Sequence, residues 1–346
     1  MNPKRLYIRL SSLGDVILAS TALEVISVPM SHECHWLVLQ EYSTLLEGHP
    51  RLNQVLTFQK KVGLKGWLRL CRKIWESEYS EIYDLHCNLR TRLMKLCFVW
   101  WSLSEQRKMP RWQMISKQRF RLYGYYLLKK LWPSKLRPQP WVQRYAQFVG
   151  GTGSERPDLR YLLFQNDFSF PSELVGKNYI CIMPSSRWRG KMWPIQHVCS
   201  LIQSKFVDFT PVILGTKQDL ESIKLLKQLS DQGINCVSGI GRWSLKETAY
   251  ILARSSGIIG VDTGLVHFAE ALGVSSITIF GPTTPDMGFG PWRADSIALG
   301  LDLNCRPCSK DGRFCCRLFQ PYHCLKGYTA KHAMSELNSR FKSARP

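Results

Sequence analysis

The 346-residue chain has no hydrophobic run long enough to cross a bilayer. Its most apolar internal stretch, around Leu96–Leu103, is far shorter than the roughly 20 residues that a membrane-spanning helix needs. Near the amino terminus, Arg9 and Asp15 interrupt the apolar segment that a secretory signal peptide requires. We therefore expect a cytoplasmic protein that can lie on a membrane without crossing it.

Acidic residues are scarce: 26 Asp and Glu stand against 47 Lys and Arg, a formal net charge of +21. Such an excess indicates an anionic partner, which can be nucleic acid, a membrane surface or a phosphorylated substrate. Between Gln106 and Gln143 the chain has ten basic residues and no acidic one. The aromatic residues among them are Trp112, Phe120, Tyr123, Tyr125, Tyr126, Trp132 and Trp141. This basic aromatic segment suits a lipid interface or stacked nucleic acid, and its plain alternative is a helix with a solvated basic face.

Short apolar or β-rich runs alternate with helical patterns along the chain. The runs that we expect to be strands are Arg5–Leu10, Trp36–Gln40, Gln54–Phe58, Glu81–His86, Tyr179–Met183, Pro211–Leu214, Gly257–Val261 and Ser276–Phe280. Alternation of this kind predicts parallel sheets covered by helices. The stretch Gly151–Pro171 breaks the alternation with Gly, Pro and Ser and reads as a linker.

The expected fold class is therefore α/β, with two Rossmann-like domains facing each other across a cleft. We place an acceptor-binding domain at residues 1–155, a linker at 156–175 and a nucleotide-sugar-binding domain at 176–328. The terminal helix, residues 329–346, is expected to pack back on the first domain. Another helix is expected over Pro194–Phe206, with proline at its first position.

The first strand-to-helix turn lacks the G-x-G-x-x-G pattern, so a nicotinamide enzyme is not indicated. It places Asp15 at the carboxyl end of a strand, where open α/β sheets hold their active sites. From the pattern alone, Asp15 fits a helix N-cap as well as a catalytic base.

Three loops of the second half suit a phosphate. Gly260–His267 runs from a strand directly into a helix that should begin near Thr263, and free N–H groups at such a helix start bind anions. The next strand ends in a second small-residue loop, Phe280–Pro285. The loop Pro184–Pro194 combines hydroxyls, glycine and three cations, and its plain alternative is an exposed basic turn.

Four motifs in order resemble those of the ADP-heptose:lipopolysaccharide heptosyltransferases, glycosyltransferase family 9. They are R-L-S-S-L-G-D at the amino terminus, Y-D-L-H-C-N-L-R at Tyr83–Arg90, K-M-W-P at Lys191–Pro194, and D-T-G-L-V-H followed by F-G-P-T. The resemblance runs over almost the whole chain and is poorest in the basic segment after Leu96.

The resemblance implies a fold of the glycosyltransferase B type and an inverting, metal-independent transfer that uses no cofactor. It gives Asp15 the role of the base, and it gives donor-phosphate binding to Lys191 and the Asp262–Gly264 turn. The expected donor-binding set is Ser186, Lys191, Asp262, Thr263, Gly264, His267 and Thr283, and the expected acceptor-binding set is Ser12, Gly14 and Arg90. His267 can also simply pack, and Arg90 fits a salt bridge equally well.

The implied donor is ADP-heptose and the implied acceptor is the phosphorylated inner core of lipid A, either Kdo-lipid A or an already heptosylated core. The implied place is the cytoplasmic face of the inner membrane. Three other functions remain open: a glycosyltransferase that uses another nucleotide sugar, a sugar-nucleotide epimerase on the same fold, and a non-catalytic nucleic-acid binder. The last gives the phosphate loops no role, so no nucleic-acid partner is expected.

Five of the twelve cysteines gather at Cys305, Cys308, Cys315, Cys316 and Cys324. Their spacing is irregular, and adjacent Cys315 and Cys316 cannot easily bind one ion together. Reduced packing cysteines, a structural metal such as zinc and a redox role all remain open, and no metal is assigned to the site.

Overall fold

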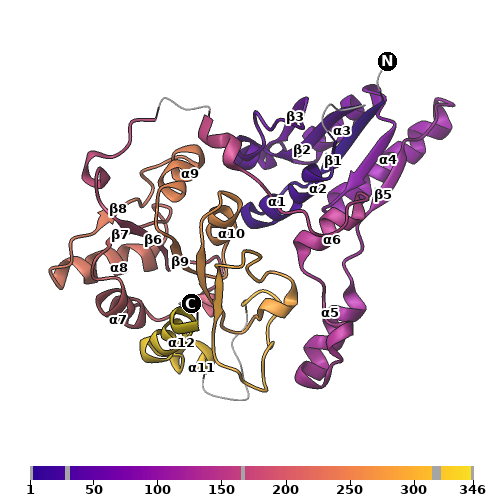
Figure 1. The fold of residues 1–346 in the computed structure, drawn as a ribbon. Coiled ribbons are helices and arrows are strands. Elements are labelled where there is room, and N and C mark those ends of the chain that lie inside the picture. Colours follow the sequence, from indigo (N-terminus) through magenta and orange to yellow (C-terminus); the bar gives the residue numbers. More distant parts are fainter. Residues whose placement is uncertain (1–2, 28–31, 165–167, 314–320, 344–346) are drawn as a thin grey trace. The chain divides into compact units, whose positions relative to one another are not determined.

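The computed structural model describes residues 3–27, 32–164, 168–313 and 321–343. It divides into two compact units (Figure 1). The first unit combines Met1–Lys117 with Trp141–Gln165, and the second combines Gln118–Pro140 with Asn166–Pro346. Within these described ranges, no helix combines the length and the hydropathy that crossing a bilayer requires.

The first unit is built on a parallel sheet in the order β3-β2-β1-β4-β5. Its strands are β1 (Lys4–Ile8), β2 (Glu33–Leu39), β3 (Gln54–Phe58), β4 (Glu81–Asp84) and β5 (Arg111–Met114). The strands expected over the first four segments are thus confirmed. Strand β5 was not expected, because its half-exposed sequence Arg-Trp-Gln-Met has no buried apolar run.

Helices cover both faces of this sheet. They are α1 (Leu13–Ala19), α2 (Thr21–Glu24), α3 (Gly63–Glu76), α4 (Leu89–Ser104) and α6 (Trp141–Phe148). Because side chains alternate along a strand, Leu6 and Ile8 of β1 join the core beneath α3 and α4, with Trp67 and Phe98. Tyr7 faces the opposite side, where it stacks on neighbouring aromatic rings.

The second unit is built on a parallel sheet in the order β11-β10-β9-β6-β7-β8. Its strands are β6 (Tyr179–Met183), β7 (Thr210–Ile213), β8 (Val237–Ser238), β9 (Ile258–Val261), β10 (Ser276–Ile279) and β11 (Ile297–Leu299). Its main helices are α7 (Ile195–Lys205), α8 (Leu220–Asp231), α9 (Leu245–Ala253), α10 (Gly264–Ala271), α11 (His323–Lys326) and α12 (Ala330–Ser343). The two sheets confirm the expected α/β class. Helix α7 begins at Ile195, one residue later than expected, and Pro194 is its N-cap rather than its first residue.

The terminal helix α12 packs against α7, inside the second unit. The expectation that it returns to the first domain is therefore wrong. Ala330, Ala333 and Leu337 recur at helical spacing and are buried in the same hydrophobic core as Val198 and Ile202 of α7. The apolar stripe of α12 is therefore covered by α7 of the same unit.

Residues 118–140 also belong to the second unit, although the chain on either side of them belongs to the first. The helix of this segment is α5 (Arg119–Leu128). Tyr125 and Trp132 form a small core with Met287, and the Tyr125 hydroxyl donates to Asp286 over 3.1 Å. A domain boundary at residue 155 therefore misses this excursion, which is stabilised by contacts across more than 150 positions of sequence.

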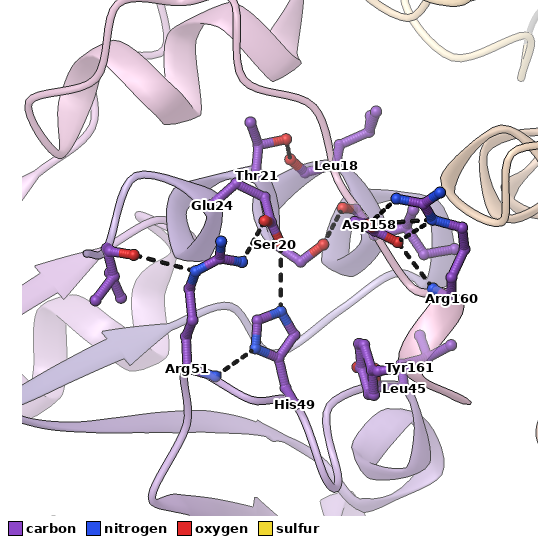
Figure 2. Close-up of polar contacts among 12 residues, drawn as sticks. Leu18, Ser20, Thr21, Glu24, Leu45, His49, Arg51, Asp158, Arg160 and Tyr161 are labelled. Atoms are coloured by element: carbon purple, nitrogen blue, oxygen red, sulfur yellow. Dashed lines mark hydrogen bonds and ion pairs between the residues drawn. The ribbon is translucent and has the colours of Figure 1, made fainter. Parts of the chain in front are cut away.

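The first part of the expected linker is anchored on the first unit (Figure 2). The Tyr161 hydroxyl donates to the carbonyl of Leu45, and the ring of His49 meets the Tyr161 ring edge-on at 4.8 Å. Asp158 caps this turn by pairing with Arg160. The first unit thus extends about ten residues beyond the expected boundary at 155, to Gln165.

Candidate active site

The first candidate site lies in the first unit, at the carboxyl ends of β1 and β4, where the chain order of the sheet reverses. From β1 the chain continues to β2 on one side, and β4 pairs with β1 on the other. Open α/β sheets form a crevice for ligands at such a point, because the loops on either side diverge. The loop after β1 carries Asp15 and the loop after β4 carries His86.

Asp15 occupies the third position of α1, and Ser12 is the N-cap of that helix. The N-cap alternative for Asp15 is therefore wrong. The Asp15 carboxylate accepts hydrogen bonds from the Ser12 backbone N–H at 3.2 Å and from the Ser12 hydroxyl at 2.8 Å. It also forms an ion pair with Arg9, whose Nη2 lies 2.7 Å from Oδ1. These contacts hold a carboxylate that remains 27% exposed.

Arg9 controls the charge of Asp15. Burial by itself would raise the pKa of the Asp15 carboxyl, but the Arg9 charge and the Ser12 hydrogen bonds outweigh burial and lower it. Asp15 is therefore ionised at neutral pH. Arg9 is itself fixed, because it donates to the carbonyl of Leu85 at 2.8 Å and to the Tyr145 hydroxyl at 3.0 Å.

His86 stands beside this pair. Burial, and then the positive charge of Arg9, lower the pKa of His86 to about 3, so the imidazole is neutral. Buried Asp84 shapes the loop, since its Oδ1 accepts from the backbone N–H groups of His86 at 2.9 Å and Cys87 at 2.8 Å. The neutral ring offers a hydrogen-bonding group, without a second charge, near the Asp15 carboxylate.

The predicted acceptor residues lie at the same edge. Ser12 contacts Asp15 directly, and Gly14 is buried in the first turn of α1. Arg90, in the first turn of α4, is exposed, and its guanidinium lies 6.0 Å from the centre of the Phe58 ring. Among the described residues no carboxylate pairs with it, so the salt-bridge alternative finds no partner there.

The second candidate site lies in the second unit, at the carboxyl ends of β6 and β9, which are neighbours at the corresponding reversal of the second sheet. Lys191 follows β6, and its Nζ lies 2.7 Å from Oδ2 of Asp262, which follows β9. The Thr283 hydroxyl donates to the same carboxylate oxygen at 3.0 Å. Three of the predicted donor-binding residues, each on a different loop, thus meet in one cluster.

Helix α10 begins beside this cluster, with Thr263 as its N-cap and Gly264 as its first residue, as expected. The first N–H groups of a helix have no partner within it, and its dipole favours negative charge there. A phosphate next to Lys191 would meet both the cation and these donors. The loop is tightly built: a side chain at Gly190 would come within 2.3 Å of the Gly312 carbonyl oxygen.

Two other predicted donor-binding residues have different surroundings. Ser186 is half-buried in the loop after β6, whereas the hydroxyl of adjacent Ser185 is buried and lies 3.0 Å from that of Ser222. His267 is 5% exposed, and its ring stacks on Trp292 with 5.6 Å between centres. The His267 ring therefore packs on Trp292, and its contact with a donor stays a prediction.

Arg9, His86 and Arg306 are parts of these two candidate sites that the sequence did not reveal. Buried Arg306 donates to the carbonyls of Phe280 and Thr283, each at 3.0 Å, and so supports the loop that carries Thr283. A basic residue gives no sign of such a role in a sequence with 47 of them. Arg9 and His86 lie within two of the motifs that carry the family resemblance, but the motif pattern assigned neither of them a role.

The cysteine cluster is described in part. Cys305 and Cys308 are half-buried, Cys324 is buried, and Cys315 and Cys316 lie outside the described residues. Burial raises the pKa of the Cys324 thiol to about 11. Within the part of the chain that the structure describes, no three His, Cys, Asp or Glu side chains are grouped to hold a metal ion.

Known proteins share this architecture. Lipopolysaccharide heptosyltransferase 1 of Pseudomonas aeruginosa is 24% identical over 327 residues, covering 88% of this chain and 86% of that protein. The structure of Escherichia coli heptosyltransferase WaaC with ADP matches with a TM-score of 0.66 at 19% identity, covering 97% of this chain and 99% of the other. The structure of E. coli ADP-heptose lps heptosyltransferase II matches with a TM-score of 0.68, also at 19% identity, covering 97% and 98%.

These structural likenesses establish the fold, with its two Rossmann-like domains of the glycosyltransferase B type. The family model described as glycosyltransferase family 9 (heptosyltransferase) matches residues 72–315, more than half of the chain. The chain therefore belongs to glycosyltransferase family 9, and the protein is a glycosyltransferase.

Proposed function

We propose that the protein transfers heptose from ADP-heptose to the inner core of lipopolysaccharide, with inversion at the anomeric carbon and without a metal ion. The acceptor is Kdo-lipid A or an already heptosylated core. The observation that carries this proposal is the Lys191–Asp262–Thr283 cluster at the start of α10, which suits a diphosphate. Relatives named lipopolysaccharide heptosyltransferase 1 support the sugar and the acceptor.

Asp15 is the base of the proposed reaction. Its carboxylate takes the proton of the acceptor hydroxyl while that oxygen forms a bond to the anomeric carbon of the donor. The bond from this carbon to the diphosphate oxygen breaks at the same time, and ADP leaves with the electron pair. A positioned base of this kind contributes about 10²–10⁴-fold to the rate. Attack from the side opposite the leaving group inverts the configuration.

Lys191 and the start of α10 receive the leaving group. Negative charge grows on the diphosphate as the bond breaks, and a cation and fixed N–H donors stabilise that charge. The Lys191 ammonium, now 2.7 Å from Asp262, would exchange part of this contact for a phosphate oxygen. Asp262, itself held by the Thr283 hydroxyl, then keeps the lysine in place. Ser186, Thr263, Gly264 and His267 complete the proposed donor site.

On the acceptor side, Ser12 and Gly14 line the approach to Asp15, and Arg90 offers an exposed cation to acceptor carboxylates or phosphates. We place the protein on the cytoplasmic face of the inner membrane. The basic aromatic segment supports this placement in part: Phe120 and Tyr123 are exposed, whereas Tyr125 and Trp132 are buried.

Mass spectrometry of Kdo-lipid A incubated with the protein and ADP-heptose tests the proposal directly. The expected result is a heptose-sized mass gain that is unaffected by a metal chelator and is lost in Asp15→Asn. Asp158→Asn is a matched control, because Asp158 is also paired with an arginine in the first unit and lies outside the proposed site. A folded protein that binds ADP but adds no heptose to either core acceptor would contradict the proposal.

A further inference from the structure

Helix α4 exposes a largely apolar stripe. Its members and their exposed fractions are Leu89 (83%), Leu96 (66%), Val99 (39%), Trp100 (70%) and Leu103 (75%). At 3.6 residues per turn these side chains, together with Arg92, fall within an arc of roughly 100°. They therefore form one face of the helix, along its whole length.

The opposite face of the same helix is its core contact. Thr91, Met94 and Phe98 are buried there, on the sheet side of α4. The helix is thus apolar on two opposite faces, although only one of them is covered by the described part of the chain. Exposed apolar patches of this kind often mark contact sites for a protein or a membrane, so a partner is expected on the outer stripe.

Charge decides which partner fits. Helix α4 contains Arg90, Arg92 and Lys95 and no Asp or Glu, in a chain whose net charge is +21. A second copy of the chain on this stripe would bring like charges together, which is unfavourable. An anionic lipid surface instead attracts Arg92 within the stripe and Lys95 beside it, and accepts the leucines and the tryptophan in its interfacial layer.

We propose that α4 lies flat on an anionic bilayer, with the stripe from Leu89 to Leu103 buried at the boundary between headgroups and acyl chains. A helix of 16 residues is about 24 Å long, which suits a helix lying in the interface rather than across the membrane. Figure 1 shows α4 as a long helix of the first unit.

This orientation deepens the proposed function and rests on it for its biological use. The first turn of α4 follows β4 at the edge of the sheet that holds Asp15, and the charge of Arg90 is felt by His86 in the same loop. A membrane along α4 therefore runs up to the edge where the acceptor hydroxyl must be deprotonated. A lipid-linked acceptor can reach Asp15 without leaving its bilayer.

Vesicle co-sedimentation of the full chain tests the surface, with phosphatidylcholine vesicles that contain or lack phosphatidylglycerol. Binding should require the anionic lipid and should weaken with salt. The variant Leu96→Gln/Leu103→Gln should bind anionic vesicles more weakly. Each substitution removes about two methylene equivalents from the interface, which corresponds to a roughly tenfold loss of affinity per leucine. The control Val207→Gln/Leu220→Gln replaces residues of 74% and 66% exposure in the second unit and should bind as the unsubstituted protein does.

Equal binding by the α4 variant and the control would overturn the proposal. So would dimerisation of the unsubstituted protein that is lost in the α4 variant, since the stripe would then join two copies. Activity separates this inference from the proposed function: the α4 variant should lose transfer to Kdo-lipid A in vesicles and keep transfer to a de-acylated, soluble acceptor. Lipid binding without transfer to either acceptor would instead refute the heptosyltransferase activity alone.

Discussion

Removing the charge of Arg9 should move the acid limb of the pH–rate profile. In Arg9→Gln, the Asp15 carboxylate keeps the two hydrogen bonds from Ser12 but loses the guanidinium at 2.7 Å. Burial then acts against ionisation with less to oppose it, so the pKa of Asp15 rises. An opposite charge at this distance typically accounts for about 1–3 pH units.

The sign of the effect follows from the role of Asp15 as a base. In the unsubstituted protein its pKa lies below the ordinary carboxyl value, so the carboxylate is ionised throughout the neutral range. Below its pKa, the ionised fraction of a base falls about tenfold for each pH unit. Arg9→Gln should therefore lose kcat/KM steeply at mildly acidic pH and much less at pH 8.

The free energy of unfolding should also depend on pH through Asp15. A carboxyl group with a lowered pKa in the folded state stabilises the protein above its unfolded pKa, and that contribution is lost as the pH falls through the folded value. Removing one partner of a buried ion pair costs about 3–5 kcal/mol, and the exposure of Asp15 places this pair near the lower end. Thermal unfolding at several pH values shows whether the variant is folded where its rate is measured.

Two variants control the experiment. Arg9→Lys keeps a positive charge and should leave the limb close to its original place. Arg5→Gln breaks an arginine–glutamate pair, also at 2.7 Å, at the other end of the same strand, and should not move the limb at all. A uniform loss of kcat/KM at every pH in Arg9→Gln would refute the reasoning, because Arg9 would then act on something other than the ionisation of Asp15.

Three further predictions concern the second unit. Lys191→Met should weaken donor binding by about 1.5–3 kcal/mol, since a charged hydrogen bond to phosphate is lost; calorimetric titration with ADP measures it, and an unchanged Kd would remove Lys191 from the donor site. Leu337→Ala should lower the free energy of unfolding by about 2–5 kcal/mol, because Leu337 is 1% exposed in the core; denaturant unfolding checks this, and a loss under 1 kcal/mol would argue that α12 adds little to the core. Tyr125→Phe removes the hydrogen bond to Asp286 and should cost about 0.5–1.5 kcal/mol; α5 should then be cleaved faster by protease, and an unchanged cleavage rate would mean that apolar packing alone holds the helix.

Local sequence determined the sheets and the positions of the loops. Buried parallel strands are continuous apolar runs, so segments such as Tyr179–Met183 were recognisable without any long-range information. The start of α10 at Thr263 followed from the same kind of local pattern. Strands β5, β8 and β11 were not predicted, because β5 is half-exposed and β8 and β11 have only two and three residues.

The sequence by itself thus determined the α/β class, the family motifs and the loops that hold Asp15, Lys191 and Asp262. Tertiary structure alone decided that Arg9 pairs with Asp15, that α5 packs on the second unit and that α12 stays there. The physical reason is the range of the interactions. Strand and helix patterns depend on neighbours a few positions away, whereas the bond from Tyr125 to Asp286 joins residues 161 positions apart, and only the folded chain brings them together.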